Sequence, residues 1–331
     1  MNLPRAVDFK PPRWLRNRHL QSLLGSSPLR RWLTQRRAIA LETHAVVEIL
    51  DVGAARLAGY HTAQRVRPQA RGMVVLLHGW EGSAQSNYVL ATGARLLSEG
   101  WDIFRLNFRD HGATHHLNPG LFHSCRIDEV VAAVGAAARA HPAPRLAVVG
   151  YSLGGNFALR VALRAPAAGI PLDYALAVCP VISPRNGLAR IERALWIYHA
   201  YFMLKWRDSL RRKQAAFPDR RYFEPGELRQ NMSGLTRSMV EKHTDYGTLE
   251  NYLDGYSIAG DRLAGLQVPA TLLTARDDPV IPVSDFETLR LPAGVELDIA
   301  EHGGHCGFLA GWRLHSFAED YISARLDRLA P

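Results

Sequence analysis

One segment of the chain joins an apolar run, a serine between two glycines and a helical pattern without a break. Residues 146–149 are all apolar, the sequence Gly-Tyr-Ser-Leu-Gly follows at 150–154, and 156–165 has helical spacing. This order predicts a buried strand that ends in a sharp turn, where small neighbours make room for a strained serine backbone. The Ser152 hydroxyl is then expected at the start of a helix, where the Leu153 N–H favours an oxyanion. We therefore expect Ser152 to be a nucleophile; the alternative is an ordinary glycine-rich turn.

Short apolar runs alternate with helical patterns from residue 45 onward. This alternation predicts the α/β class, with a mostly parallel central sheet flanked by helices. A chain of 331 residues with 47% hydrophobic residues can bury a large core without a disulfide or a metal. Strands are expected at 46–50, 73–77, 101–107, 146–149, 175–179, 271–274 and 295–299, and helices at 127–140, 156–165 and 316–329.

The stretch 183–262 interrupts this alternation. It is rich in aromatic residues, arginine and lysine, and its pattern is helical over 191–216. Because it lies between two expected strands of one sheet, we interpret it as a helical cap inserted into an α/β core of residues 45–182 and 263–331. Its apolar side chains either form a channel for an acyl chain or simply pack on the core. They are Trp196, Ile197, Tyr198, Tyr201, Phe202, Met203 and Trp206.

Residues 1–44 form a basic N-terminal segment. The first 40 residues hold nine lysines and arginines against one acid, Asp8, so most of the net charge of +9 lies there. Apolar residues alternate with the bases, and we expect them to pack the segment on the core. The alternative is a peripheral contact with an anionic membrane surface, whereas no nucleic-acid-binding module is recognisable. The apolar residues in question are Phe9, Trp14, Leu15, Leu20, Leu23 and Leu24.

The cysteines and the first residues bear on the cellular compartment. Cys125, Cys179 and Cys306 are widely spaced and form no CxxC pair, so neither a disulfide framework nor a zinc site is indicated. Such usage fits a reducing compartment. The first residues contain no apolar core of a signal peptide, and no apolar run approaches the roughly 20 residues that cross a bilayer. We expect a cytoplasmic protein.

Ser152 needs a base, because a serine hydroxyl is a weak nucleophile near neutral pH. In enzymes with such a turn, the acid and then the histidine follow the serine in the chain. Asp278 comes just after the apolar run 271–274 and is followed four residues later by a proline, Pro282. We expect it to orient the histidine. Asp277 is the alternative candidate for this role. If it does not orient the histidine, it is expected to cap the loop or to pair with Arg276.

His305 lies in a glycine-rich loop at 301–308, between the last expected strand and the last expected helix. The glycines allow the backbone to fold so that the imidazole can reach Ser152. We expect His305 to act as the general base toward the serine and then as the general acid toward the leaving group. His302, in the same loop, is the reserve candidate.

The loop after the expected strand 73–77 has the sequence His-Gly-Trp-Glu-Gly at 78–82. A loop in this place supplies the second oxyanion donor, which we expect to be the N–H of Trp80, beside that of Leu153. The side chain of His78 is expected to stabilise the turn.

Three further histidines, His111, His115 and His116, cluster in the segment 109–116. Imidazoles ligate zinc, so a metal site is one interpretation of this cluster. No HExxH pattern and no further ligand at suitable spacing accompany them, and we favour a polar loop near the mouth of a pocket. No metal and no cofactor are expected.

Taken together, these motifs and several other segments of the chain resemble the YheT-like branch of the α/β-hydrolase superfamily. The more specific parts of the resemblance are Pro-Pro-Arg-Trp-Leu at 11–15, Asn-Arg-His-Leu-Gln at 17–21 and Asn-Phe-Arg at 107–109. Leu-Leu-His-Gly-Trp-Glu-Gly at 76–82, Ser-Asn-Tyr at 86–88, the serine turn, Asp-Asp-Pro at 277–279 and His-Gly-Gly-His at 302–305 complete it. The sequence departs from the family's pattern in two segments, 109–112 and 243–248, and the second has one acid fewer. Both segments are expected to line the pocket.

The resemblance implies a serine hydrolase that acts on carboxylic esters, with lipid-like or medium-chain acyl substrates among the relatives. Acyl transfer to an alcohol is the chemical neighbour, because it uses the same acyl-enzyme. A non-catalytic binding member of the fold is the second class of function. The oligomeric state, the acyl-chain length and the alcohol remain open.

Overall fold

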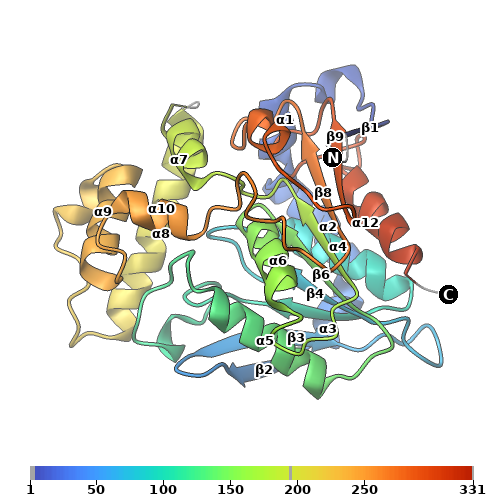
Figure 1. The fold of residues 1–331 in the computed structure, drawn as a ribbon, viewed down its shortest axis with the longest axis horizontal. Helices are drawn as coiled ribbons and strands as arrows, with labels where there is room; N and C mark the ends of the chain where they lie inside the picture. Colours follow the sequence, from blue (N-terminus) through green and yellow to red (C-terminus); the bar gives the residue numbers. More distant parts are fainter. Residues whose placement is uncertain (1–3, 194–195, 330–331) are drawn as a thin grey trace.

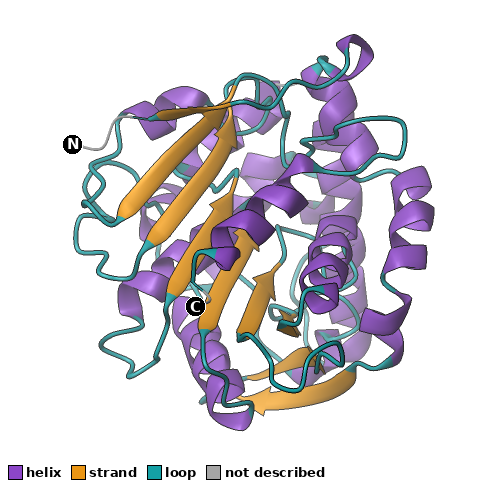
Figure 2. Ribbon diagram, turned by 90° about the vertical axis from the view of Figure 1, so that its right-hand side faces the viewer, coloured by secondary structure: helices purple, strands orange, loops and turns teal. Residues whose placement is uncertain are grey.

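The computed structural model describes residues 4–193 and 196–329. Figure 1 shows a twisted sheet at the centre, helices on both of its faces and a separate group of helices, residues 184–255, at the left. Figure 2 shows the twist of the strands from the side. The expected α/β class, with a mostly parallel sheet flanked by helices, is confirmed.

Nine strands form the sheet within the described residues. They are β1 (Arg5–Val7), β2 (Val46–Asp51), β3 (Arg56–Thr62), β4 (Met73–Leu77), β5 (Asp102–Leu106), β6 (Leu146–Tyr151), β7 (Tyr174–Val178), β8 (Ala270–Ala275) and β9 (Val295–Ala300). Their order in the sheet is β1-β9-β8-β7-β6-β4-β5-β3-β2. Every neighbouring pair from β1 to β5 is parallel, whereas β3 pairs antiparallel with both β5 and β2.

The helices precede, connect and follow these strands. The α-helices are α1 (Arg18–Gly25), α2 (Pro28–Arg37), α3 (Ile39–Thr43), α4 (Asn87–Ser98), α5 (Ile127–Ala140), α6 (Leu153–Arg164), α7 (Pro184–Arg193), α8 (Trp196–Ala216), α9 (Met232–His243), α10 (Leu249–Gly255), α11 (Val283–Glu287) and α12 (Phe317–Asp327). Short 3-10 helices are η1 (Arg13–Leu15), η2 (His115–Leu117) and η3 (Glu227–Arg229).

The core lies on both faces of the sheet, because alternate residues of a strand point to opposite sides. In β4, Met73, Val75 and Leu77 belong to the apolar cluster on the side of α5 and α6. Val74 and Leu76 belong to the cluster on the side of α4 and α12. This double burial explains why the central strands are apolar throughout instead of alternating.

The N-terminal segment lies along the last part of the chain. β1 pairs with β9 and becomes an edge strand, beside which the N-terminus is drawn in Figure 1. Phe9 and Leu15 are buried, as expected. Leu23 is 40% exposed, because the buried face of α1 carries Gln21 and Ser22 instead. The remaining apolar residues of the expected set are half-buried: Trp14, Leu20 and Leu24.

A buried ion pair ties α2 to α12. Arg30 and Glu319 are each 2% exposed or less, and the guanidinium donates to the carboxylate at 3.1 Å. Arg37 donates to the other oxygen of Glu319 at 2.8 Å. The same Glu319 closes a capping box with Ser316 at the start of α12. The first and last helical parts of the chain therefore share one buried carboxylate.

The residues 183–262 connect β7 to β8 and contain α7, α8, α9 and α10. These helices hold an apolar cluster of their own, which includes Met203, Trp206, Leu235 and Met239. The helix expected over 191–216 is present as α7 and α8; residues 194–195 between them lie outside the described part. No helix among the described residues combines the length and the apolarity needed to cross a bilayer.

All seven strands that the sequence predicts are present, with ends that shift by one or two residues. Two strands, β1 and β3, were not predicted. β3 contains Gly59, which in sequence indicates a break. A side-chain carbon at Gly59 would lie 2.1 Å from the ring of Phe104, so the glycine here accommodates a buried aromatic of β5. β1 has only three residues, and its pattern carries no strand signal.

Candidate active site

The parallel strands end at one edge of the sheet, so the loops that follow them meet there. The loops after β4, β6, β8 and β9 carry Trp80, Ser152, Asp278 and His305. The four residues expected to do the chemistry, together with Leu153 at the first position of α6, therefore lie at the same edge.

Ser152 stands at the turn between β6 and α6 in a strained conformation, with φ 54° and ψ −118°. A side-chain carbon at Gly150 would lie 2.0 Å from the carbonyl oxygen of Gly154, and one at Gly154 would lie 2.3 Å from that of Leu77. Glycine is thus required on both sides of the serine. The turn is held by the Ser152 N–H, which donates to the Val178 carbonyl at 2.9 Å.

Ser152, His305 and Asp278 form one chain of hydrogen bonds. His305 Nε2 lies 2.9 Å from the Ser152 hydroxyl oxygen, and His305 Nδ1 lies 2.8 Å from Asp278 Oδ2. Because an ionised carboxylate can only accept, Nδ1 carries the proton and Nε2 is left to accept from the serine. This is the tautomer that a general base needs.

The two competing aspartates have different partners. The carboxylate of Asp278 is 1% exposed, and its second oxygen accepts from the N–H groups of Val280 at 2.7 Å and Ile281 at 3.0 Å. Asp277 faces the histidine loop from the side: it accepts from the Gly304 N–H at 2.9 Å and lies 3.5 Å from His302 Nδ1. Asp277 and His302, the two reserve candidates, therefore contact each other and not Ser152.

Arg276, the other partner considered for Asp277, lies elsewhere. Its guanidinium contacts Glu301 at 3.1 Å and Glu287 at 3.5 Å on the surface. Asp277 therefore contacts the histidine loop and not Arg276.

Two opposing effects act on the His305 imidazole. Burial lowers its pKa, but the Asp278 carboxylate and, after it, the neighbouring Cys306 raise it, and the net result is a pKa well above the ordinary value of 6.5. The protonated form of the His305 imidazole is thus stabilised by Asp278.

The N-terminal helix α1 braces the loop that carries His305. The Ser22 hydroxyl accepts from the His305 N–H at 2.8 Å and donates to the Arg18 carbonyl at 2.8 Å. The buried Gln21 amide donates to the carbonyls of Leu15 and Leu309 and accepts from the Leu309 N–H at 2.6 Å. The histidine loop is therefore fixed from outside the α/β core.

The two expected oxyanion donors flank Ser152. Leu153 is the first residue of α6, so its N–H has no acceptor within the helix. The loop with Trp80 lies against the serine, since a side-chain carbon at Gly79 would lie 3.3 Å from Ser152 Cβ. The Gly79 N–H donates to the Tyr88 hydroxyl at 2.9 Å, which fixes this loop on α4. No acceptor for the Trp80 N–H occurs among the described residues, so it is available to a ligand.

His78 holds the same loop from below. Its Nδ1 contacts the Gly79 carbonyl at 2.8 Å and its Nε2 accepts from the Phe108 N–H at 3.2 Å. The side chain is buried, and burial, its largest effect, lowers the His78 pKa well below 6.5. A neutral, doubly bonded imidazole of this kind stabilises the turn, as expected.

The histidine cluster at 111–116 does not converge. His111 contacts the Arg109 carbonyl at 2.7 Å and accepts from the Glu81 N–H, whereas His115 contacts the Ser209 hydroxyl at 2.9 Å. His116 is exposed. These histidines are not among the groups of described side chains that are close enough together to share a metal ion.

A cavity of about 540 Å³ lies above Ser152, between the core and the helices 184–255. Ser152 and His305 line it, and so does the segment Asp110–Gly112. Its apolar lining includes Trp80, Leu188, Phe202, Trp206, Met232 and Met239. The expectation that 243–248 also lines it is wrong: this segment joins α9 to α10, and its Tyr246 lies behind His123 and Tyr252, which do line the cavity.

The apolar residues expected in the cap divide into two groups. Tyr201, Phe202 and Trp206 line the cavity. Tyr198 and Met203 are buried, whereas Trp196 and Ile197 are 78% and 38% exposed. The interpretation as a channel lining thus holds for some of these residues, and the interpretation as packing residues holds for others.

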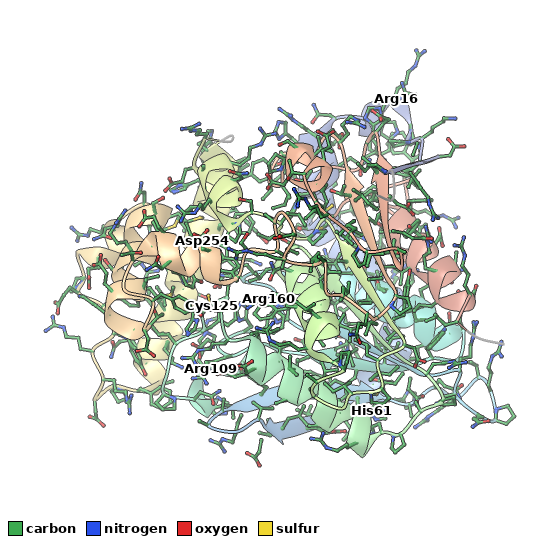
Figure 3. The ribbon with its side chains drawn as sticks, viewed as in Figure 1. Arg16, His61, Arg109, Cys125, Arg160 and Asp254 are labelled. Carbon is green, nitrogen blue, oxygen red and sulfur yellow. The ribbon has the colours of Figure 1, made fainter. Side chains whose placement is uncertain are left out.

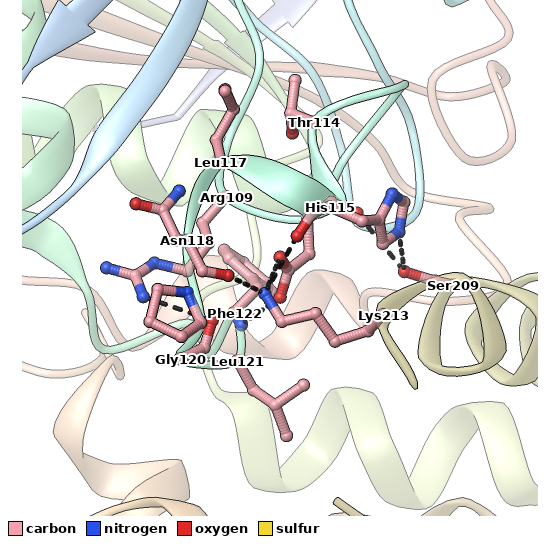
Figure 4. A network of polar contacts seen from close by, with 12 residues as sticks. Arg109, Thr114, His115, Leu117, Asn118, Gly120, Leu121, Phe122, Ser209 and Lys213 are labelled. Atoms are coloured by element: carbon pink, nitrogen blue, oxygen red, sulfur yellow. Dashed lines mark hydrogen bonds and ion pairs between the residues drawn. The ribbon is translucent and has the colours of Figure 1, made fainter. Parts of the chain in front are cut away.

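A buried ion pair anchors the cap beside the cavity. Lys213 of α8 is fully buried, and its ammonium donates to Asp110 at 2.6 Å and to the carbonyls of His115 and Asn118 (Figure 4). Asp110 also accepts from the Phe122 N–H at 2.8 Å. Burial raises the pKa of Asp110 and lowers that of Lys213, so each ion depends on the other.

Sequence reasoning did not assign a role to Ser22, Tyr88 or Lys213. Ser22 and Tyr88 lie in or next to the motifs 17–21 and 86–88, so a signal was present, but a motif does not tell which loop its side chain contacts. Lys213 carried no signal, since an arginine- and lysine-rich helix usually places such residues in solvent.

Comparison with known proteins gives the following matches. A family model described as the alpha/beta hydrolase fold matches residues 72–311, well over half of the chain. The chain is 26% identical over 326 residues to the candidate esterase YheT of Escherichia coli (strain K12), covering 94% of this chain and 89% of that protein. It is 27% identical over 273 residues to a candidate esterase of Synechocystis sp. (strain ATCC 27184 / PCC 6803 / Kazusa), covering 73% and 72%.

Solved structures share the fold at lower identity. The esterase Pf2001 of Pyrococcus furiosus superposes with a TM-score of 0.52 at 15% identity, over 87% of this chain and 92% of that one. A membrane phospholipase A described as a bacterial virulence factor gives a TM-score of 0.55 at 16% identity, over 91% and 92%. At this identity the likeness concerns the fold alone.

Proposed function

Because the chain belongs to the alpha/beta hydrolase fold family, as a YheT-like, esterase-like member, we propose that it is a serine hydrolase that cleaves carboxylic esters through an acyl-enzyme on Ser152. The observation that carries the proposal is the hydrogen-bond chain from Ser152 through His305 to Asp278. A nucleophile, a base within reach and a third group that orients the base are the parts that acyl transfer requires.

The first half of the reaction follows from this geometry. His305 Nε2 takes the hydroxyl proton as the Ser152 oxygen attacks the carbonyl carbon of the ester. The negative charge that develops on the carbonyl oxygen is met by the N–H groups of Trp80 and Leu153. When the intermediate collapses, His305 returns the proton to the departing alcohol, and the acyl group stays on Ser152.

The second half repeats these steps with water. His305 takes a proton from a water molecule that attacks the acyl-enzyme, and the acid leaves as the proton returns to Ser152. An alcohol in place of water would make the protein an acyltransferase. The cavity above Ser152 has room for either nucleophile, and we favour hydrolysis because the curated relatives are named as candidate esterases.

The cavity supports an apolar acyl group as the substrate. The Trp80 ring packs on Phe202, with centroids 5.6 Å apart, and on Trp206, at 5.3 Å, and all three side chains line the cavity together with Ser152. An acyl chain that leaves water for such a site gains about 0.8 kcal/mol per buried CH₂ group. We therefore propose lipid-like or medium-chain acyl esters as the substrates, with Ser152, His305 and Asp278 supplying the chemistry.

The substitution Ser152→Ala tests the proposal. It removes the nucleophile and keeps the fold, so turnover of p-nitrophenyl esters is expected to fall by a factor of about 10⁴ or more. The matched control is Ser98→Ala, on the exposed end of α4, which is expected to behave as the unmodified protein. An ester series from acetyl to palmitoyl then reports the acyl length that the cavity prefers.

Covalent labelling separates catalysis from binding alone. A fluorophosphonate is expected to add to Ser152 in the folded protein, detected by mass spectrometry of the labelled peptide. A chain that binds esters without hydrolysing them, and that takes no label at Ser152, would be a non-catalytic member of the fold, and the proposal would then be wrong.

A further inference from the structure

Two helices form the rim of the cavity. Side chains that line the cavity and are also exposed mark this rim, among them Pro28 and Arg31 on α2, and Tyr201, Lys205, Asp208 and Arg212 on α8. The two helices meet at one loop, because Arg31 donates to the Gln85 carbonyl at 3.0 Å and Lys205 to the Glu81 carbonyl at 3.3 Å. The α2 rim belongs to the N-terminal segment and the α8 rim to the cap.

Large apolar side chains stand in solvent within one helical turn of these rim residues. On α2, Leu29 is 56% exposed and Trp32 is 50% exposed. On α8, Ile197, Tyr201 and Leu204 are 38%, 41% and 66% exposed. Their spacing places each set on a single face of its helix. We call these five residues the rim surface.

Basic groups accompany the apolar ones on both helices. The Arg36 guanidinium lies over the Trp32 ring at 4.0 Å, and the Lys205 ammonium lies over the Tyr201 ring at 4.9 Å. An indole or phenol ring with a cation on it is the pairing that proteins place at the level of lipid headgroups.

Charge complementarity indicates what this surface meets. No acidic residue occurs between Asp8 and Glu42. Five exposed arginines of this stretch have no carboxylate within ion-pair distance among the described residues: Arg13, Arg16, Arg18, Arg31 and Arg36. Arg16 extends outward from the molecule in Figure 3. On α8 the rim acid Asp208 is paired with Arg212, which is also on the rim.

We propose that the rim surface docks on an anionic phospholipid bilayer and so brings the mouth of the cavity to the membrane. The apolar side chains enter the headgroup region, and Arg31, Arg36 and Lys205 neutralise the lipid phosphates. This inference rests on the proposed function only in naming a lipid ester as the molecule that enters the cavity. It departs from a contact through N-terminal charge alone, because three of the five residues of the surface lie on α8 of the cap.

Vesicle sedimentation tests the docking directly. The unmodified protein is mixed with sucrose-loaded vesicles of phosphatidylcholine, with and without phosphatidylglycerol, at low and high salt. Sedimentation is expected to be several-fold greater with phosphatidylglycerol and to weaken at high salt, because exposed charges are screened. The double variant Trp32→Glu with Leu204→Glu is expected to lose roughly tenfold or more of the binding, since it replaces apolar contacts on both helices by like charge.

Val66→Glu is the matched control, because Val66 is an exposed large apolar residue, 59% accessible, that does not line the cavity. It is expected to bind vesicles as the unmodified protein does. If the rim variant still sediments normally, if Val66→Glu loses as much binding, or if phosphatidylglycerol makes no difference, the inference is wrong. Failure of the unmodified protein to bind any vesicle, which would leave the surface to a protein partner, also overturns it.

Two readouts keep this inference apart from the proposed function. Neither Trp32 nor Leu204 lines the cavity, so the rim variant is expected to hydrolyse a soluble acetyl ester at the normal rate. Ser152→Ala is expected to bind vesicles normally while it hydrolyses nothing. Loss of vesicle binding with intact hydrolysis in the rim variant supports the docking, whereas a protein that docks but never hydrolyses an ester contradicts only the function.

Discussion

The carboxylate of Asp278 divides its two oxygens between two tasks. One oxygen is held by the N–H groups of Val280 and Ile281, and the other faces His305 Nδ1. Such a carboxylate cannot rotate away from the imidazole, because turning it would leave two buried N–H groups without acceptors. A charge that is fixed and buried acts strongly on the His305 pKa.

This geometry predicts the pH dependence of hydrolysis. His305 must be neutral to act as a base, and its pKa lies well above 6.5, so kcat/KM is expected to rise with pH through a midpoint above 6.5. Asp278→Asn removes the charge, and the rising limb is expected to move to lower pH while kcat falls by a factor of about 10⁴. A pH profile with a soluble ester measures both effects.

Asp277→Asn is the control for that experiment. Asp277 contacts the Gly304 N–H and not His305, so a smaller loss of kcat is expected and the rising limb is expected to stay in place. The roles of the two aspartates would be reversed if Asp277→Asn moved the limb and Asp278→Asn did not.

At the scale of single residues, sequence reasoning works where chemistry restricts the residue type. Ser152, Asp278 and His305 follow from the glycine-flanked turn and from their order along the chain, and the structure brings them within hydrogen-bond distance. Ser22 and Tyr88 could not be assigned, since any chain contains many serine and tyrosine hydroxyls. Only the folded chain tells which backbone N–H each of them meets.

At the scale of elements, α1 holds the loop of the proposed base through Ser22. Ser22→Ala removes the acceptor for the His305 N–H, which is expected to cost about 1 kcal/mol in transition-state stabilisation, or roughly a fivefold lower kcat. The rate of labelling by a fluorophosphonate should fall in parallel, because both reactions need the same imidazole.

Thermal unfolding separates this effect from a general loss of stability. Ser98→Ala, which removes an exposed hydroxyl, is the comparison, and the rates of both variants are measured well below their unfolding midpoints, so that any difference reports on the folded protein. Equal labelling rates in the two variants would contradict a positioning role for Ser22.

The cap and the core are joined by an ion pair whose removal should be costly. Lys213→Met leaves Asp110 buried without its cation, and we expect the free energy of unfolding in urea to fall by about 3–5 kcal/mol. Combining it with Asp110→Asn is expected to recover part of that loss, because the stranded charge is gone.

Lys242→Met provides the comparison for this prediction. Lys242 pairs with Glu227 in a position where the lysine is 47% exposed, and such a pair contributes about 0–1 kcal/mol. Equal losses in Lys213→Met and Lys242→Met would mean that the buried pair does not anchor the cap.

At the scale of the whole molecule, the sequence predicts the parallel centre of the sheet and the edge strand β2, and it misses β3 and the other edge strand, β1. The inner strands are buried on both faces, so their residues must be apolar, and such runs are visible without a structure. The edge strand β1 exists only because β9 offers it a partner, and three residues carry no pattern of their own. Tertiary pairing of this kind cannot be detected in the segment that it orders.

The placement of the cap was predictable because it interrupts a regular alternation. Its contribution to the cavity was not, since the helical pattern of 191–216 does not tell which aromatic rings face inward. Tyr201 and Phe202 are neighbours in the chain, and both line the cavity, yet Tyr201 is also 41% exposed. The rim surface could therefore not be predicted from the sequence, because it depends on α2 and α8 contacting the same loop.

The contacts between the two ends of the chain bear on how it folds during synthesis. β1 pairs with β9, Ser22 holds His305, and Arg30 is neutralised by Glu319, residues more than 280 positions away in each case. A ribosome adds about 5–20 residues per second, so the N-terminal segment waits on the order of tens of seconds for these partners. During that interval Arg30 and the apolar residues of the segment lack the partners that bury them in the folded protein. We therefore expect chaperones to bind the nascent chain. The histidine loop, in turn, is held in place only after nearly all of this chain has emerged, so ester hydrolysis by an unfinished chain is not expected.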